Sequence, residues 1–300
     1  MRTTLSVVAK TEITHALRER SSHLLVGIFS AMVVVSAAIG FQTHRTVTRI
    51  HESLVQHGLT VAANPFADVS PLYYARNSVI YVVMIGSLMA IVLGVESTLR
   101  DRRAGVVSLI LSRPSAFTHV LRGKLMGIGL VLAAVLLLSM ALSWTMLSAI
   151  VGSPLGLEET LRLGVFGMLS WVLLLGFAGV GMMFGTRSRH ESTAYVAPFV
   201  AWSVIAFVLP QMGTAARPIS LLNPVPTPAG GGSLASWLSY IVHPLSVTEQ
   251  FKTVSGFLLQ EPYVSGDVAG GVASVVVFAL LMTVLSTRSR RKTITEELDA

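Results

Sequence analysis

Six apolar runs, each long enough to cross a lipid bilayer as a helix, follow one another along this chain. They cover residues 24–41, 77–96, 125–151, 163–185, 192–213 and 268–287. A helix needs about 20 apolar residues to cross a hydrocarbon core of about 30 Å, so each run predicts a transmembrane helix. Only 12% of the 300 residues are charged, too few to cover the surface of a soluble globule. We therefore predict an all-α integral membrane protein with a single transmembrane domain over residues 1–300.

The basic residues predict the orientation of these helices. If the first residue lies in the cytoplasm, the segments on that side hold 16 of the 22 Lys and Arg. Because loops rich in Lys and Arg stay in the cytoplasm, we expect both termini there and a multi-pass protein of the plasma (inner) membrane. The net charge of +7 then reflects topology, and the lipid bilayer rather than nucleic acid is the expected partner. The first run is longer than the apolar part of a cleaved signal peptide, so we expect an uncleaved span.

A helix is predicted ahead of the first run, where apolar residues recur every four positions. These are Leu5, Ala9, Ile13 and Leu17, with Val8 and Ala16 beside them. We expect Lys10 and Glu12 on the opposite, polar face. The pattern predicts an amphipathic elbow helix on the cytoplasmic leaflet, and a solvated N-terminal helix is the alternative.

Two long outer loops are predicted, at residues 43–76 and 214–267. The first carries His44, His51 and His57, which we expect to be solvated rather than metal ligands. The second contains two apolar stretches, 234–242 and 251–259, that are too short to span. We predict re-entrant or interfacial half-helices packed against the bundle before the last span, with ordinary surface helices as the alternative.

Small residues are frequent in the fourth run. Gly181 and Gly185 form a G-x-x-x-G pair, which permits close helix packing within the chain or, alternatively, between two copies.

Residues with recognisable chemistry are scarce. The chain has no Cys, no G-x-x-x-x-G-K-[ST] phosphate loop and no H-E-x-x-H pair, so we predict no catalytic, cofactor-binding or metal-binding residues. The only acid in any run is Glu96, whereas ion-coupled transporters keep charged groups at mid-membrane. The energy for any transport is therefore expected to come from another subunit. Pro198 and Pro210 leave ion coupling open, because a broken fifth helix could bind a cation through its carbonyls.

The loop at residues 97–124 has the most specific sequence. It follows Glu96, is basic at Arg100, contains Gly105 and a short apolar stretch, and reaches Pro114 before a second basic turn. This pattern is typical of a surface helix that docks into a groove of a partner. A basic loop held to anionic lipid is the alternative.

This loop resembles the ABC-2-type permease family, in which a Glu closes the second span and a "G-T-L…L-L-S-x-P…G-K" stretch precedes the third. The residues that match in type and order are Glu96, Gly105, Leu109, Leu111, Ser112, Pro114, Gly123 and Lys124. The elbow helix, the six spans and the long outer segment match in layout. Within the family, the chain is most similar to the branch that includes the permease of nitrous-oxide-reductase copper-site maturation. The family's hydrophobic-hydroxyl-Arg triplet after the proline is replaced by Ser115, Ala116 and Phe117, so docking would use other residues, such as Arg113 or His119.

The resemblance implies the permease subunit of an ATP-binding cassette exporter, without a nucleotide site of its own. A separate ATPase subunit, which binds ATP and Mg, would dock on the 97–124 loop together with residues 186–191, and a second permease copy or paralogue would complete the transporter. The coupling residues it implies are Glu96, Arg100, Gly105, Leu109, Ser112, Arg113, Pro114, Gly123 and Lys124. We further expect Glu96 to pair with a nearby Arg. An ion-coupled secondary transporter is the main alternative, followed by a membrane anchor or assembly factor.

Overall fold

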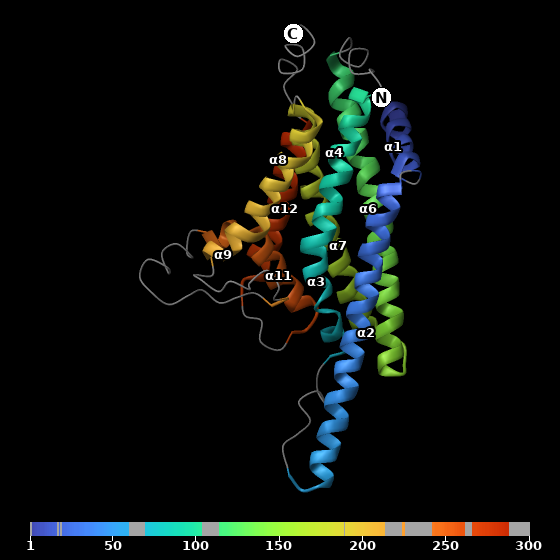
Figure 1. Cartoon of the computed structure of the whole chain (residues 1–300), viewed down its shortest axis with the longest axis vertical. Coiled ribbons are helices and arrows are strands. Elements are labelled where there is room, and N and C mark those ends of the chain that lie inside the picture. Colours follow the sequence, from blue (N-terminus) through green and yellow to red (C-terminus); the bar gives the residue numbers. More distant parts are fainter. Residues whose placement is uncertain are drawn as a thin grey trace.

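A computed structural model gives the architecture of the chain (Figure 1). It describes residues 2–16, 18, 20–59, 70–103, 114–188, 190–213, 224–225, 242–261 and 266–287. The predicted all-α class is confirmed, since the described residues are mostly helical and include no β-strand. Six of their helices are long and apolar enough to cross a membrane, as predicted.

The helices follow one another in a simple order. A short helix α1 (Arg2–Ala16) precedes the first span, α2 (Arg20–Gln56). The second span contains η1 (Pro71–Ala75), α3 (Ser78–Tyr81), the π-helical turn η2 (Val82–Gly86) and α4 (Ser87–Arg103). The third and fourth are α6 (Pro114–Val151) and α7 (Leu157–Arg187). The fifth contains α8 (Glu191–Ser203), a second π-helical turn η3 (Val204–Val208) and α9 (Leu209–Gly213). Then come η5 (His243–Leu245), α11 (Val247–Leu258) and the last span, α12 (Val268–Thr287).

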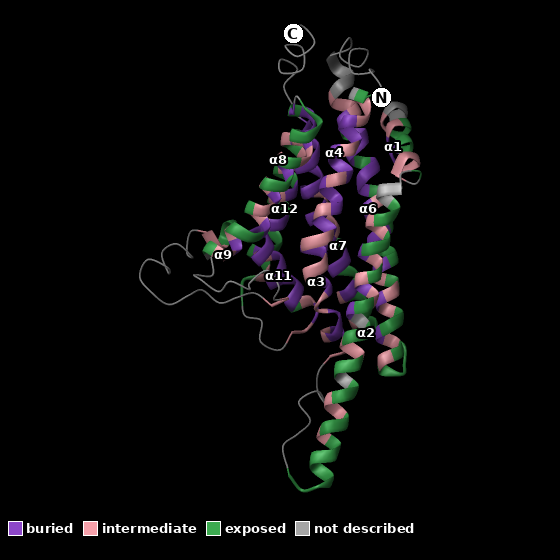
Figure 2. Cartoon of the chain, viewed as in Figure 1, coloured by how far each residue is buried: buried purple, intermediate pink, exposed green. Residues whose placement is uncertain are grey.

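The spans form one elongated bundle, and the start of α1 and the end of α12 lie at the same end of it (Figure 1). We call this the terminal end; α4 ends there and α6 begins there. α7 is the central helix and packs against α4, α6, α8 and α12. The most apolar windows of the second and fourth spans are 67% and 61% buried, against 18% for the first and 17% for the last. Figure 2 shows the exposed sides of α2, α6 and α12, which would face lipid in a membrane.

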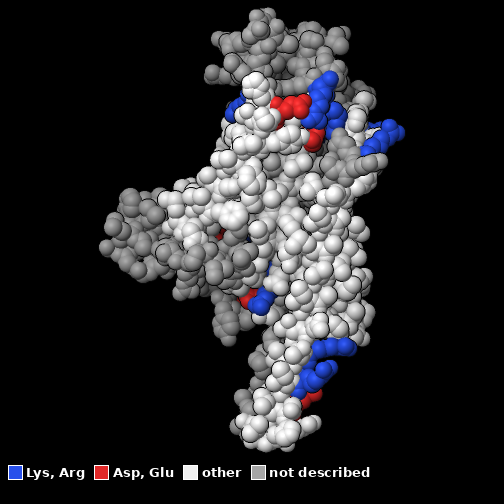
Figure 3. Space-filling view, viewed as in Figure 1, with Lys and Arg blue, Asp and Glu red and all other residues white. Residues whose placement is uncertain are grey.

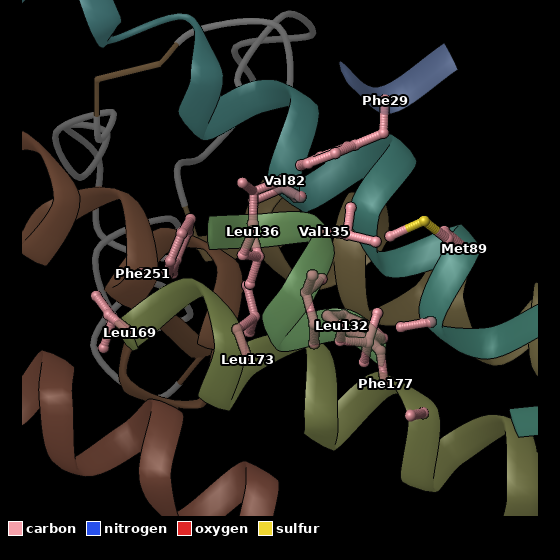
Figure 4. Close-up of a cluster of buried hydrophobic side chains, with 14 of the residues drawn as sticks. Phe29, Val82, Met89, Leu132, Val135, Leu136, Leu169, Leu173, Phe177 and Phe251 are labelled. Carbon is pink, nitrogen blue, oxygen red and sulfur yellow. The ribbon is translucent and has the colours of Figure 1, made fainter. Parts of the chain in front are cut away.

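Close packing holds the centre of the bundle together. Large apolar side chains from α2, the second span, α6, α7 and α11 meet there (Figure 4). They include Phe29, Met89, Leu132, Leu173, Phe177 and Phe251, all almost fully buried. Lipid is as apolar as these side chains, so tight van der Waals contact, rather than removal from water, stabilises their association.

The α4–α7 interface depends on glycines. A Cβ on Gly94 would collide with the carbonyl oxygen of Ala178, and one on Gly181 would collide with that of Ile91. A Cβ on Gly185 would meet the hydroxyl of Thr98. The predicted G-x-x-x-G pair therefore serves packing within the chain, the first of the two alternatives.

The first spanning helix is longer than its apolar run. α2 continues to Gln56, so the beginning of the predicted 43–76 loop is helical, because no residue before Gly58 breaks the helix. Gly58 then adopts a φ of 66° and donates to Val55 O, while Leu59 donates to Leu54 O. This pair of bonds is a Schellman cap, which favours glycine at the left-handed position.

The prolines do not break the fifth span, in contrast to the sequence-based alternative. Residues 191–212 form one continuous spanning helix that contains Pro198 and Pro210. The disturbance is confined to the π-helical turn η3. Proline supplies no backbone N–H, and the π-helical turn just before Pro210 inserts an extra residue without ending the helix.

One of the two predicted half-helices is present before the last span. Residues 251–258 of the predicted 251–259 stretch belong to α11, which begins earlier, at Val247, and packs against α7 and α12. Nine of its residues are buried, so it is part of the bundle and not a surface helix. The other stretch, 234–242, lies outside the described residues apart from Val242.

Candidate functional site

Four of the predicted coupling residues, Gly105, Leu109, Ser112 and Arg113, lie outside the described residues. The two flanks of their loop are described: α4 ends at Arg103, and α6 begins at Pro114. Proline suits the first position of a helix, because its missing N–H would have no helical partner there. The flanks carry most of the charged contacts at the terminal end, and Figure 3 shows charged side chains gathered there.

Arg103 joins the two segments that were predicted to meet a partner. Its Nε lies 2.9 Å from Glu191 Oε1, and its Nη2 donates to Glu191 Oε2 at 3.0 Å. Arg103 closes α4 and Glu191 opens α8, so this two-point pair connects the 97–124 and 186–191 segments. The hydrogen bond to Glu191 raises the pKa of Arg103, and the guanidinium stays charged at physiological pH.

Glu96 lies behind this pair. Its Oε2 is 3.4 Å from Arg103 Nη1, which confirms the expected pairing with an arginine. The hydroxyl of Tyr195, on α8, donates to Glu96 Oε1. Glu96 thus gives a second connection between α4 and α8, about two helical turns from Arg103 along α4 and about one turn from Glu191 along α8.

A more buried group of charges ties α1 to α4 and α6. Arg100 Nη1 lies 3.0 Å from Glu12 Oε2. Lys124 Nζ lies 3.5 Å from Glu12 Oε1 and 2.8 Å from Asp101 Oδ2, and it donates to the carbonyl oxygen of Ser97. Buried charges are tolerated only when paired and hydrogen-bonded, and each of these ions has at least one partner. We call Glu12, Arg100, Asp101 and Lys124 the α1 cluster.

Glycines on α6 allow α1 to approach closely enough for these contacts. A Cβ on Gly123 would lie 2.9 Å from Val8 Cβ, and one on Gly127 would lie 2.7 Å from Glu12 Cβ. Both distances are shorter than real Cβ contacts, so any side chain there would push α1 away. Gly123 and Lys124 therefore hold α1 against the bundle, a structural role that the sequence pattern did not indicate.

The prediction that Glu12 lies on the polar face of the N-terminal helix is wrong. Glu12 is buried because it follows Leu5 and Val8 at helical spacing and lies on the side that meets α6. The spacing of apolar residues describes only the N-terminal helix itself. The partners of Glu12, which are Arg100 and Lys124, lie on two other helices. The only signal of burial in the sequence was that Glu12 lies four residues after the apolar Val8.

Further into the bundle, the two π-helical turns are joined. Ser87 follows η2 directly, and Trp202 stands just before η3. Trp202 Nε1 donates to Ser87 Oγ at 2.6 Å, and the indole packs edge-on against Phe207 with ring centroids 5.1 Å apart. This bond connects the second and fifth spans deeper in the bundle than the Glu96–Tyr195 bond does.

Away from the end of the bundle where α4 ends and α6 begins, α11 contains a buried ion pair that the sequence did not predict (Figure 1). Glu249 Oε1 lies 2.7 Å from Lys252 Nζ, and their side chains are 0% and 1% exposed. Glu249 precedes the 251–259 stretch that was predicted to pack against the bundle, and Lys252 lies within it, but neither charge was predicted to be buried. Their spacing of three on one helix face was the only signal.

A second ion pair closes the end of α11. Arg76 Nη1, just before α3, lies 3.2 Å from Glu261 Oε1. Burial raises the pKa of Glu261, and Arg76 opposes this effect. Gln260 adopts a φ of 56°, which lets Glu261 donate its backbone N–H to Gly256 O at 2.9 Å. The pair fixes the start of the second span to the end of α11.

These arrangements are connections between helices rather than a centre for bond chemistry. Among the described residues, no group of three or more His, Cys, Asp or Glu is arranged to hold a metal ion.

Comparison with known proteins agrees with this architecture. A family model described as "ABC-2 family transporter protein" matches residues 6–291. No curated protein matches the chain. The family match does not distinguish branches, so similarity to the nitrous-oxide-reductase maturation permease stays a prediction.

Proposed function

The chain belongs to the ABC-2 family of transporter proteins, and we propose that it is the permease subunit of an exporter driven by a separate ATPase. Membership of this family and the six helices that could span a membrane support a permease role. We propose the plasma (inner) membrane as its location, with the terminal end facing the cytoplasm, where ATP is available. In this proposal ATP and Mg bind to the ATPase, and a second permease copy or paralogue completes the transporter.

The Arg103–Glu191 pair carries this proposal. The 97–124 and 186–191 segments are the two connections between spans at the terminal end, and a partner that moves one must displace the other while the pair is intact. A bidentate Arg–carboxylate pair fixes direction as well as distance. The two segments would therefore respond to a docked ATPase as one unit.

The contacts behind this pair suggest how a movement would spread. The hydrogen bond between Tyr195 and Glu96 would transmit this movement between α4 and α8. The Ser87–Trp202 bond joins the same two spans at their π-helical turns. The α1 cluster carries it to α1 and α6. ATP shifts the balance between two arrangements only if the ATPase fits one of them better, so the proposal requires that the docked loop differ between the two.

An ion-coupled secondary transporter is the second candidate, and one observation favours it. Glu249 and Lys252 are ionisable groups buried in the bundle beside the last span, the kind of residue that ion-driven transporters retain. Because the two groups face each other, they can neutralise one another without any transported ion. We therefore rank the ATP-driven permease first.

Co-purification tests the first candidate. We would extract a tagged chain from its native membranes in mild detergent and identify stoichiometric partners by mass spectrometry. We expect an ATPase with a phosphate-binding Walker motif to co-purify with the unaltered chain. This ATPase should no longer co-purify with the Arg103→Glu variant. Arg162→Glu is the matched control, since Arg162 also pairs with an acid, Glu158, but lies away from the two docking segments. Recovery of the chain alone, or only with proteins lacking a nucleotide site, would favour the secondary transporter.

A further inference from the structure

An apolar groove of about 470 Å³ lies between α1, α2, α4 and α6. Ten of its eleven lining residues are apolar, and His23 is the exception. Its walls include Ile13 and Ala16 of α1, Val26 of α2, Leu93 of α4, and Val131 and Leu138 of α6. The volume falls in the range of pockets that bind small molecules, about 300–1,000 Å³.

The groove lies at membrane depth. Its α2, α4 and α6 residues belong to three spanning helices. Along α6 it extends from Leu130 to Leu138, about 12 Å at a rise of about 1.5 Å per residue. The groove is partly open on its outer side, where the exposed faces of α2 and α6 would meet lipid. Water is excluded from the hydrocarbon core, so an apolar molecule must fill this space.

A small polar pocket adjoins the groove, and basic side chains flank its α1 wall. A smaller pocket lined by Glu12, Glu96 and Arg100 shares Ala16, Leu93 and Val131 with the groove. Lys10 lies one helical turn before Ile13 on α1, and both Lys10 and Arg18 are exposed. The carboxylate of Glu12 is already paired with Arg100 and Lys124. Arg18 lies two residues after Ala16, and His23 lines the groove itself, so the exposed charged side chains on both sides of the α1 wall are positive.

We propose that the groove binds one acyl chain of an anionic phospholipid from the surrounding leaflet, with the phosphate beside Arg18 and His23. An apolar slot flanked by the exposed Lys10 and Arg18 matches a molecule with an apolar tail and an anionic head. A water-soluble ligand would lose its hydration here without polar partners in return. The bound chain would contact α1 and α4, the two elements that the α1 cluster connects, so the lipid would stabilise the seating of α1.

Photo-crosslinking tests the acyl-chain part of the proposal. The full chain would be placed in lipid nanodiscs containing phosphatidylglycerol with a diazirine on one acyl chain, and labelled peptides would be mapped by mass spectrometry. Ala134→Phe fills the groove from α6, while Leu137→Phe places the same aromatic ring on the same helix at a residue that does not line the groove. We expect labelling of α1 and α4 peptides to fall several-fold in Ala134→Phe and to stay unchanged in Leu137→Phe. If Ala134→Phe does not fold, Ala16→Phe fills the groove from α1.

The headgroup part needs a separate comparison. Arg18→Gln with His23→Gln should reduce the excess of labelling by phosphatidylglycerol over phosphatidylcholine, whereas Arg49→Gln, an exposed arginine elsewhere on α2, should not. Equal labelling of the groove and of the exposed face of α6 that carries Leu137 would show that the lipid only surrounds the protein and has no specific site. This result would overturn the proposal. Because the chain has no Cys, a single Cys at position 134 can report a second copy. Disulfide-linked dimers with an unlabelled groove would assign it to that copy and also overturn the proposal.

Discussion

Lys124 of α6 and Glu12 of α1 face each other with Nζ and Oε1 3.5 Å apart, and their side chains are only 4% and 8% exposed. The same ammonium lies 2.8 Å from Asp101 Oδ2 at the end of α4. One lysine therefore holds three helices together at the end of the bundle where a partner is proposed to dock. The N-terminal helix is thus bound to the frame and would move with α4 and α6.

Replacing Lys124 with Met should destabilise the protein strongly. The change leaves the Glu12 and Asp101 carboxylates with fewer counter-charges in a buried place, and breaking one side of a buried pair costs about 3–5 kcal/mol. We expect a clearly lower melting temperature in detergent, measured by tryptophan fluorescence. Lys124→Met with Glu12→Gln should recover part of the loss. Arg122→Met is the control, since Arg122 is an exposed neighbour on α6, and an equal loss there would contradict this interpretation.

Exchanging the charges of Arg103 and Glu191 separates coupling from stability. Both side chains are about half exposed, at 47% and 59%, and exposed pairs stabilise a fold by only about 0–1 kcal/mol. Arg103→Glu should therefore leave the melting temperature nearly unchanged while it uncouples the two docking segments. When the purified ATPase is added back in excess, we expect the Arg103→Glu permease to stimulate ATP hydrolysis less than the unaltered permease does.

The double variant Arg103→Glu with Glu191→Arg provides the control for this prediction. It restores an opposite-charge pair between α4 and α8 in the reverse direction, so part of the ATPase stimulation should return. If the double variant is no better than Arg103→Glu alone, Arg103 does not act through Glu191.

The fold could be predicted from the sequence to a large extent, because the bilayer imposes it. A span must be about 20 apolar residues long, so hydropathy alone gives six helices, and each of them is present. Helix ends were less accurate: α2 runs on to Gln56 because polar residues outside the bilayer still favour a helix until Gly58 ends it. Local sequence reports burial in lipid better than it reports helix length.

The site could be predicted only in part. Glu96 was singled out from local sequence, and it does pair with an arginine; the docking role of the 97–124 and 186–191 segments stays a prediction. Glu12, Asp101 and Glu191 were missed because their roles depend on partners from other helices, and a helical wheel shows only the residue's own helix. Glu249 and Lys252 were missed because an amphipathic stretch of 12 residues can lie on a surface or inside a bundle. Tertiary packing alone decides between these places.

Gly181 should be intolerant of even a methyl group. A Cβ there would collide with the Ile91 carbonyl on α4, and overpacking a tight interface destabilises by about 1–3 kcal/mol. Gly181→Ala should therefore lower the melting temperature. Gly164 lies on the same helix with nothing near its Cβ position, so Gly164→Ala should be neutral or slightly stabilising, because Ala favours a helix by up to about 1 kcal/mol over Gly. Equal effects of the two changes would show that α4 and α7 do not pack this closely.

The Glu249–Lys252 pair should tolerate loss of both charges better than loss of one. Glu249→Gln removes the carboxylate that faces the buried Lys252 ammonium. Breaking one side of a buried ion pair costs about 3–5 kcal/mol, whereas replacing both ions by apolar residues of similar size is often neutral. We expect Glu249→Gln and Lys252→Met to lower the melting temperature and Glu249→Leu with Lys252→Met to recover it. Transport in the double variant then distinguishes the candidates. An ATP-driven permease should remain active, while a secondary transporter that uses these charges should not.

The end of α11 should become less stable as the pH rises. Burial raises the pKa of Glu261 above its ordinary value of 4.5, so the folded protein binds this proton more tightly than the unfolded chain does. The resulting stability is fully present below pH about 4.5 and is lost as the pH rises through the folded pKa. Hydrogen exchange of residues 256–261 should therefore be slower at pH 5 than at pH 7, after correction for the intrinsic rate. Glu261→Gln should remove this difference and leave exchange in α7 unchanged. A pH effect that persists in Glu261→Gln would show that another group is responsible.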